Sequence, residues 1–194
     1  MALSGDVTRR SEVDSVVQAT LDRFGKVYFR VNDGGVLRSS SVAEIDKNKW
    51  DFVVDSNHKG AFLFSQAVLP SMRAAHSGRI LNVASLAGMA TSTLGGAHYT
   101  AAKAGVLGLS RHLAREMGPF QINENAICPG IVSTPMVRAI VDEVSEQRIL
   151  QSIPFRLLRD VRGNCTTHPF PSIRRIQLYH WRSGRHHGGE MIFH

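Results

Sequence analysis

Three polar residues, Ser85, Tyr99 and Lys103, have the types and spacing of a proton-transfer site. Tyr99 and Lys103 stand four residues apart in the segment H-Y-T-A-A-K-A-G, so on a helix both side chains leave from the same face. A tyrosine with a pKa near 10 is a poor proton donor or acceptor at neutral pH unless a cation such as Lys103 stabilises its phenolate. Ser85 ends the segment R-I-L-N-V-A-S and can hydrogen-bond a substrate oxygen within reach of the phenol. The three residues therefore predict proton transfer between an alcohol and a carbonyl compound.

Segments with helical or strand periodicity surround these residues. Apolar spacing predicts helices over residues 11–24, with Gly25 as the stop, over 60–72 and over 99–117. Strands are predicted over 26–32, 79–85 and 123–130. Because strands that alternate with helices need crossover connections, we expect an α/β fold with a parallel sheet and helices on both faces. Asn32, Ser85 and the Pro129-Gly130 pair stand at strand ends, where functional groups gather in such sheets.

Length, charge and cysteine content narrow the class of protein. A chain of 194 residues with 43% hydrophobic content is expected to form one domain. Of the net charge of +7, residues 159–194 contribute +4, and the mildly basic remainder has no stripe suited to nucleic acid. Cys128 and Cys165 lack metal-like or redox-like spacing, and no apolar run suits a membrane span or a secretory signal. We therefore expect a cytoplasmic protein that binds neither nucleic acid nor membrane.

Five segments occur in an order and at distances that point to a known family. They are N-D-G-G, D-S-N-H-K-G, L-N-V-A-S, Y-T-A-A-K and C-P-G-I-V-S-T-P-M. Together they resemble the short-chain dehydrogenase/reductase family over residues 5 to about 158. The resemblance implies a Rossmann-like fold, NAD or NADP as cofactor, a small-molecule carbonyl or alcohol substrate and a homo-oligomer. It indicates neither the particular substrate nor the choice between NAD and NADP.

The resemblance also implies roles for four catalytic residues. Tyr99 would be the general acid/base, Lys103 would lower its pKa and bind the nicotinamide ribose, and Ser85 would orient the substrate carbonyl. Asn57 matches the fourth catalytic residue, which supports a water-linked proton relay from the lysine. The alternative for Asn57 is a helix or strand cap.

Cofactor contacts are implied at further positions. Asp6 and Val7 resemble the adenine-contacting pair of the family, and a solvated turn is the alternative. Pro129, Gly130 and Thr134 resemble the loop that holds the nicotinamide carboxamide, to which backbone groups of residues 130–132, Val132 included, would contribute. Asn32 and Gly34 of the turn N-D-G-G are also implied as cofactor contacts. A turn that binds no cofactor could carry the same Pro-Gly pair.

The sequence departs from the family at several places. The glycine-rich turn T-G-x-x-x-G-x-G is absent, and we expect an incomplete Rossmann-like sheet that lacks the first βαβ portion and the last strand. The family motif N-N-A-G has become N-D-G-G, and Arg30 lies in a strand expected to be buried, where an unpaired guanidinium is costly. The alternative function is therefore a catalytically inactive fragment or interaction subunit that cannot bind cofactor.

Residues 159–194 lose hydrophobic periodicity and are rich in Arg, His, Pro and Gly. Codons shifted by one nucleotide from Arg159 onward permit a sequence that resembles the family's ending. In it, a glycine from Trp181 and a stop from Met191 and Ile192 are forced by the genetic code. The chain is thus interpreted as a partial family domain over 1–158 and an out-of-frame tail over 159–194. For His186, His187 and His194 we favour a solvated tail over a metal site, because partners at ligand spacing are absent.

Overall fold

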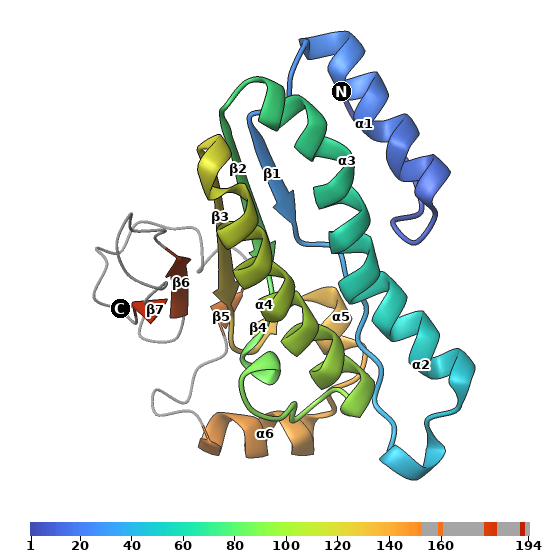
Figure 1. Cartoon of the computed structure of the whole chain (residues 1–194). Helices are drawn as coiled ribbons and strands as arrows, with labels where there is room; N and C mark the ends of the chain where they lie inside the picture. Colours follow the sequence, from blue (N-terminus) through green and yellow to red (C-terminus); the bar gives the residue numbers. More distant parts are fainter. Residues whose placement is uncertain (153–158, 161–176, 182–190, 193–194) are drawn as a thin grey trace.

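In a computed structural model of the chain, a mixed sheet lies beside a layer of helices (Figure 1). The structure describes residues 1–152, 159–160, 177–181 and 191–192. The sheet has the order β1-β2-β3-β6-β7. Three strands are parallel, namely β1 (Phe29–Asn32), β2 (Gly78–Val83) and β3 (Ile122–Cys128). The α/β class with a parallel, Rossmann-like sheet flanked by helices is confirmed.

Helices form the crossovers between the parallel strands. Helix α1 (Arg10–Phe24) precedes β1, and α4 (Ala97–Met117) joins β2 to β3. A continuous helical segment joins β1 to β2 and consists of α2 (Lys47–Val54), the π-helical turn η2 (Asp55–Lys59) and α3 (Gly60–Ala74). Short helices α5 (Pro135–Arg138) and α6 (Glu143–Ser152) follow β3, and the 3-10 turns are η1 (Val42–Glu44), η3 (Leu86–Gly88) and η4 (Gly118–Phe120).

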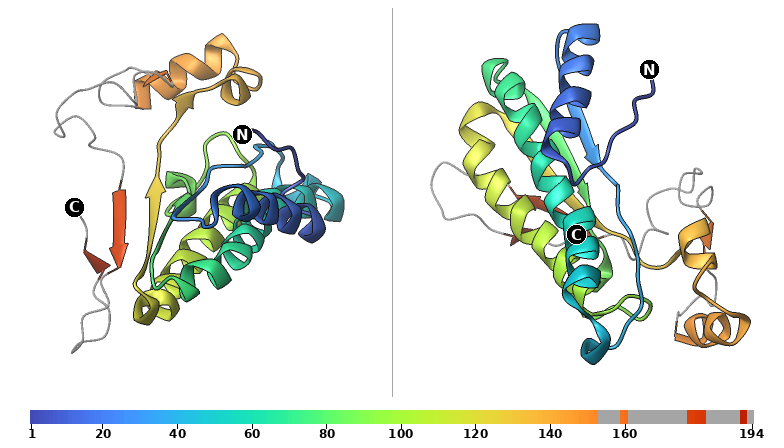
Figure 2. Two further views of the ribbon diagram at one scale, coloured as in Figure 1. Left: turned by 90° about the horizontal axis from the view of Figure 1, so that it is seen from above. Right: turned by 90° about the vertical axis from the view of Figure 1, so that its right-hand side faces the viewer.

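Helices α1, α3 and α4 lie side by side in one layer (Figure 2), where α3 packs between the other two. Alternation along β1 turns Arg30 and Asn32 toward α3. The intervening residues Phe29 and Val31 face the other way and are exposed. The face of the sheet that carries the helices is therefore the one that holds the described core.

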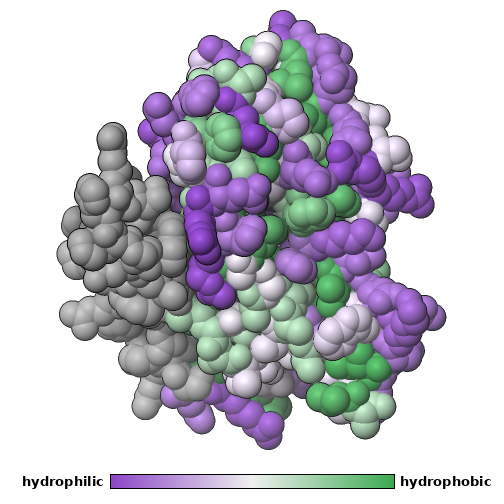
Figure 3. All heavy atoms as spheres, viewed as in Figure 1, coloured by the Kyte–Doolittle hydropathy of each residue, from purple (hydrophilic) through white to green (hydrophobic). Residues whose placement is uncertain are grey.

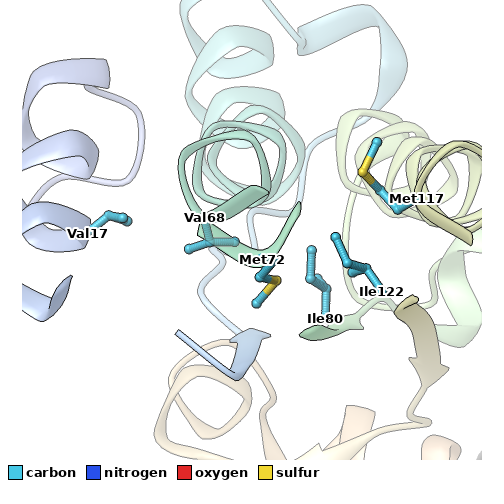
Figure 4. Close-up of a cluster of buried hydrophobic side chains, with 6 residues drawn as sticks. All are labelled: Val17, Val68, Met72, Ile80, Met117 and Ile122. Carbon is cyan, nitrogen blue, oxygen red and sulfur yellow. The ribbon is translucent and has the colours of Figure 1, made fainter. Parts of the chain in front are cut away.

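A cluster of buried apolar side chains packs these helices against the strands (Figure 4). Its members come from α1, α3, α4, β2 and β3 and are Val17, Val68, Met72, Ile80, Met117 and Ile122. Gly78 makes the packing of Met72 possible, since a Cβ there would lie 2.5 Å from the Met72 sulfur. Burial of each such side chain contributes about 1.5–3 kcal/mol. The parallel pairing of β1, β2 and β3 brings their carboxyl ends together at one edge of the sheet.

The predicted helices and strands are all found, but α1, α3 and α4 lie in one layer, whereas helices on both faces of the sheet were expected. The structure also has elements that were not predicted, α2 among them. Helix α1 ends at Gly25 as expected, because Gly25 takes the left-handed conformation (φ 75°) and its N–H donates to the Leu21 carbonyl oxygen at 2.7 Å. The predicted strand over 26–32 is shorter and begins at Phe29. Helix α2 was missed, although Asp46 caps it by accepting a hydrogen bond from the Lys49 N–H at 2.8 Å.

The penalty that the place of Arg30 in a strand suggested is only partly offset, because its Nε atom is buried without a hydrogen-bond partner. Its guanidinium lies over the Phe64 ring, 4.0 Å from the centroid, and half-buried contact with an aromatic face stabilises a cation. Burial still lowers the pKa of this guanidinium. The arginine therefore packs on α3 through its planar face.

The sheet continues beyond β3 into the region interpreted as a non-family tail. Strand β6 (Gln177–Trp181) pairs with β3 and runs antiparallel to it, and β7 (Met191–Ile192) pairs with β6. A separate pair joins β4 (Val132–Ser133) to β5 (Arg159–Asp160). The rest of the tail, with His186, His187, His194 and Cys165, lies outside the described residues. Among the described helices, none has the length and apolar character needed to cross a membrane.

Candidate active site

Ser85, Tyr99 and Lys103 come together at the carboxyl end of β2. The Ser85 hydroxyl lies beside the phenol of Tyr99, close enough to lower the pKa of that phenol. The Lys103 ammonium nitrogen lies 5.8 Å from the centroid of the Tyr99 ring and donates a hydrogen bond of 2.8 Å to the carbonyl oxygen of Val83. The residues singled out by their spacing thus form one cluster between α4 and the end of β2.

A glycine brings the Ser85 segment onto helix α4. Ser85 caps η3 by accepting a hydrogen bond from the Ala87 N–H at 3.1 Å. A Cβ at Gly88 would lie 2.6 Å from the carbonyl carbon of Lys103 and 2.8 Å from the nitrogen of Ala104. Because real side chains do not approach a backbone so closely, this contact of η3 with α4 requires glycine, and it sets the distance between Ser85 and Tyr99.

The loop after β3 is tied to the same place. The Ser85 backbone lies beside the sulfur of Cys128, and the Leu86 N–H donates to the Pro129 carbonyl oxygen at 3.0 Å. A Cβ at Gly130 would meet only the Leu86 side chain, at 3.6 Å. Pro129 and Gly130 therefore lie beside Ser85, with open space over the glycine.

Asn57 occupies the π-helical turn η2, a departure from regular helix that recurs at functional sites. Its amide donates to the carbonyl oxygens of Val53 and Val36, each at 2.8 Å, so it ties the helix to the loop after β1. Its side-chain oxygen is buried and has no partner. A Cβ at Gly35 would lie 2.5 Å from that oxygen. The side chain thus bridges two segments instead of capping a helix or strand, and the proton relay stays a prediction.

Burial dominates the electrostatics of the cluster. It raises the pKa of Tyr99, against an opposing effect of the neighbouring Ser85 hydroxyl. It lowers the pKa of Lys103 to about 8, against an opposing effect of the Asp33 charge. The expected lowering of the Tyr99 pKa is therefore not the net effect in this structure, in which the phenol holds its proton at neutral pH.

Two of the remaining predicted contacts have structural partners of their own. Asn32 is buried, and its amide donates to Asn82 at 2.7 Å and to Ser65 at 3.2 Å. Its side-chain amide therefore links β1 to β2 and α3. A contact of Asn32 with the cofactor would have to use its backbone groups. The Asp6 carboxylate accepts two hydrogen bonds from Thr8, as in a local turn.

The other predicted contacts lie at or near the same edge. Val7 packs on α3, since a Cβ at Gly60 would lie 2.8 Å from its Cγ2 atom. Gly34 is exposed, with no atom within 4 Å of a Cβ placed there. Val132 lies in β4, and the Thr134 hydroxyl caps α5 by accepting a hydrogen bond from the Val137 N–H at 3.2 Å.

The donor set fits the nicotinamide end of NAD or NADP. A phenol and an ammonium lie together at the edge of the sheet, and the open backbone of Gly34 and Gly130 flanks them. Tyr99 and Lys103 would bind the ribose, and backbone groups of the Pro129–Gly130 loop would bind the carboxamide. Among the described residues, no group of three or more His, Cys, Asp or Glu side chains could hold a metal ion.

A buried polar network that was not anticipated lies below this edge. Asn82 donates to the Ser110 hydroxyl at 2.8 Å and to a carboxylate oxygen of Glu124. The other Glu124 oxygen is buried without a partner, and burial raises the pKa of this carboxyl to about 8. The signal was present in β3, because alternation from Ile122 through Ala126 and Cys128 places Glu124 on the buried face.

Comparison with known proteins agrees with this geometry. A family model described as short chain dehydrogenase matches residues 1–145. The chain belongs to the short-chain dehydrogenase/reductase family. A 3-oxoacyl-[acyl-carrier-protein] reductase of Synechocystis is 36% identical over 154 residues, which cover 79% of this chain and 60% of that protein. The corresponding reductase of Staphylococcus epidermidis is 35% identical over 155 residues, which cover 80% of this chain and 63% of that protein.

Solved structures of the same family have the same fold. A protein of Sinorhizobium meliloti described as a short-chain alcohol dehydrogenase superposes with a TM-score of 0.77 at 33% identity and covers 84% of this chain and 66% of its own. A short-chain dehydrogenase/reductase of Burkholderia xenovorans gives 0.76 at 29% identity, with 85% and 64% covered. The chain thus spans about three fifths of the length of the curated relatives it matches.

Proposed function

We propose that this chain carries the proton-transfer site of an NAD(P)-dependent oxidoreductase that interconverts an alcohol and a ketone or aldehyde. The observation that carries the proposal is the grouping of Ser85 and Tyr99 beside the buried Lys103, whose ammonium lies 5.8 Å from the centroid of the Tyr99 ring. This group lies where the parallel strands end, which is the usual place for a ligand in such sheets.

The protonation states favour the direction of carbonyl reduction. Because the pKa of Tyr99 is raised, its phenol is protonated at neutral pH and can donate that proton to a carbonyl oxygen. Ser85, beside the phenol, would hold the same oxygen within reach. Lys103 would stabilise the phenolate that remains until a proton is recovered from solvent. Bound NAD(P)H would supply the hydride to the carbonyl carbon.

The substrate is proposed only as a class. The named relatives are 3-oxoacyl-[acyl-carrier-protein] reductases, so a 3-oxoacyl thioester is a reasonable first compound to test beside simple ketones and aldehydes. We also propose self-association. Exposed aromatic side chains, Trp50, Phe52 and Phe62, lie along α2 and α3, and Figure 3 shows apolar areas among polar ones on the helical side. A cytoplasmic location stays a prediction.

The test measures cofactor binding before turnover. NADH and NADPH are titrated against the purified chain, with quenching or a shift of cofactor fluorescence as the signal, and oxidation of the cofactor is then followed with each carbonyl compound. The Tyr99→Phe variant is expected to bind cofactor and to lose turnover. Turnover that survives this change would exclude the role of Tyr99. Lack of binding at millimolar cofactor would favour the alternative, an inactive fragment or interaction subunit.

A further inference from the structure

Lys103 is a buried cation at the centre of the site. It is 5% exposed, and its ammonium donates a hydrogen bond to the Val83 carbonyl oxygen. Removal from water lowers the pKa of Lys103 to about 8. A buried ammonium loses its proton readily unless a neighbouring anion favours the charged form. The role proposed for Lys103 needs that charge.

Groups from several elements lie around this ammonium, and Ser85 belongs to them through its contact with Tyr99. They are Asn57 of η2, Ser85 after β2, Tyr99 of α4, Cys128 of β3 and Asp33 of the turn after β1. The first two side chains are uncharged amide and hydroxyl groups. Burial raises the pKa of Tyr99 and raises that of Cys128 to about 11, so phenol and thiol are both neutral at neutral pH. Of the groups named, Asp33 is the one that supplies negative charge.

The sheet register and the packing of the turn place Asp33 beside Lys103. Asn32 is paired with Asn82 across the parallel strands β1 and β2. The next residue, Asp33, therefore follows alongside Val83, whose carbonyl oxygen accepts the Lys103 hydrogen bond. Two residues further on, a Cβ at Gly35 would lie 3.7 Å from the ammonium nitrogen. The turn that begins with Asp33 therefore approaches the end of the lysine side chain at Gly35.

We propose that Asp33 is a positioning residue of this site, whose carboxylate keeps the buried ammonium of Lys103 charged. This charge stands where the family motif N-N-A-G has an uncharged asparagine, so it is a feature of this chain. Asp33 is exposed, and its field acts on a neighbour that is shielded from water. The consequence for catalysis rests on the proposed function, whereas the coupling of the two charges does not.

The coupling is measured by NMR on the chain without cofactor or substrate. With lysine labelled at Cε, the five lysines of the chain give five signals, and the Lys103→Arg variant identifies that of Lys103. In Asp33→Asn the titration midpoint of Lys103 is expected to fall below that of the parent, and the charged fraction at pH 7.5 to fall several-fold. Asp33→Glu restores the midpoint toward the parent value.

The control uses another lysine and aspartate. Lys47 pairs with Asp51 on the surface of α2, and the Asp51 carboxylate raises the pKa of Lys47. Asp51→Asn is therefore expected to shift the Lys47 signal and to leave that of Lys103 in place. A shift of Lys103 equal to that in Asp33→Asn would mean a general effect of net charge and would overturn the proposal.

A second readout connects the pair to catalysis. If charged Lys103 is needed, kcat/KM falls as pH rises through its pKa, and this alkaline limb moves to lower pH in Asp33→Asn. An unchanged Lys103 midpoint in both Asp33→Asn and a second uncharged variant, Asp33→Ser, overturns the inference even if the chain is active. A shifted midpoint in a chain without oxidoreductase activity supports the inference and refutes the proposed function.

Discussion

Lys103 donates a hydrogen bond to the carbonyl oxygen of Val83, and so a side chain of helix α4 is fastened to the carboxyl end of strand β2. The bond fixes the ammonium beside Ser85 and Tyr99 without the help of a bound ligand. It also places a cation in a buried position, where charge lowers stability unless it is compensated. The hydrogen bond of Lys103 thus positions the ammonium for catalysis, whereas burial of its charge lowers stability. Mutation of Lys103 can separate the effect on activity from the effect on stability.

Replacement of Lys103 by methionine is expected to separate activity from stability. Methionine keeps most of the buried volume and removes the charge, so the free energy of unfolding at pH 7 should not fall by more than about 1 kcal/mol. Turnover should fall about 100-fold or more, because the phenolate of Tyr99 loses its cation. Urea unfolding and steady-state rates measure the two effects. Lys26→Met, at an exposed residue near the Tyr28 ring, is the control, and equal rates in the two variants would contradict the role of Lys103.

The contact of η3 with α4 predicts that alanine substitution has opposite effects on stability at two glycines. Gly88→Ala forces a Cβ to within 2.6 Å of the Lys103 backbone, so η3 must move and carry Ser85 away from Tyr99. We expect a loss of about 1–3 kcal/mol in the free energy of unfolding and a loss of turnover. Gly108→Ala, within α4, meets only the Arg111 side chain at 3.9 Å and should raise stability by about 0.5–1 kcal/mol. Thermal unfolding distinguishes them, and two similar melting temperatures would refute the close contact.

The architecture was predictable from sequence where periodicity was strong. Helix α1 shows apolar spacing and a terminal glycine, and both features have direct structural counterparts in Val13, Val17 and Gly25. Helix α2 was missed because it has little apolar periodicity, and Val53 is its one buried residue. Its start depends instead on the Asp46 cap, a signal carried by a single side chain.

The residues that form the site were easier to predict from sequence than their environment and hydrogen-bond partners. The four-residue spacing put Tyr99 and Lys103 on one face of a helix, and the order of elements put Ser85 close to them. Spacing could not show that burial raises the pKa of Tyr99 in spite of the neighbouring Ser85 hydroxyl, because desolvation depends on the whole surrounding fold. It also could not show that the Asn32 amide donates a hydrogen bond to Asn82, since these two residues are 50 positions apart in the sequence.

The region after residue 158 leads to a prediction about the gene. The family model ends its match at residue 145, and the alignments with the two reductases span 154 and 155 residues. We expect the coding nucleotides from Arg159 onward, read one position out of frame, to encode a family-like ending with a glycine at Trp181 and a stop at Met191 and Ile192. Sequencing of the gene and its transcript tests this. Unrelated residues in that frame, or no stop, would exclude the out-of-frame interpretation.

Glu124 predicts how stability depends on pH. Burial raises the pKa of this carboxyl from 4.5 to about 8, whereas hydrogen bonds with Ser110 and Asn82 oppose the rise. The folded chain therefore binds this proton more tightly than the unfolded chain does, and the stabilisation is complete below pH 4.5 and is lost as pH rises to about 8. Within that window the free energy of unfolding should fall by about 1.4 kcal/mol for each pH unit from this residue alone.

The matched variants isolate that carboxyl from the other titrating groups. Glu124→Gln keeps an oxygen to accept the Asn82 hydrogen bond and cannot ionise, so its unfolding free energy should decline less between pH 5 and pH 8 than that of the parent. Glu116→Gln, at an exposed glutamate that pairs with His112 on α4, should keep the parent slope. Urea unfolding at pH 5, 6, 7 and 8 gives the slopes directly. If the parent and Glu124→Gln lines run parallel, the carboxyl is already ionised in the folded chain and must have found a partner or water for its second oxygen.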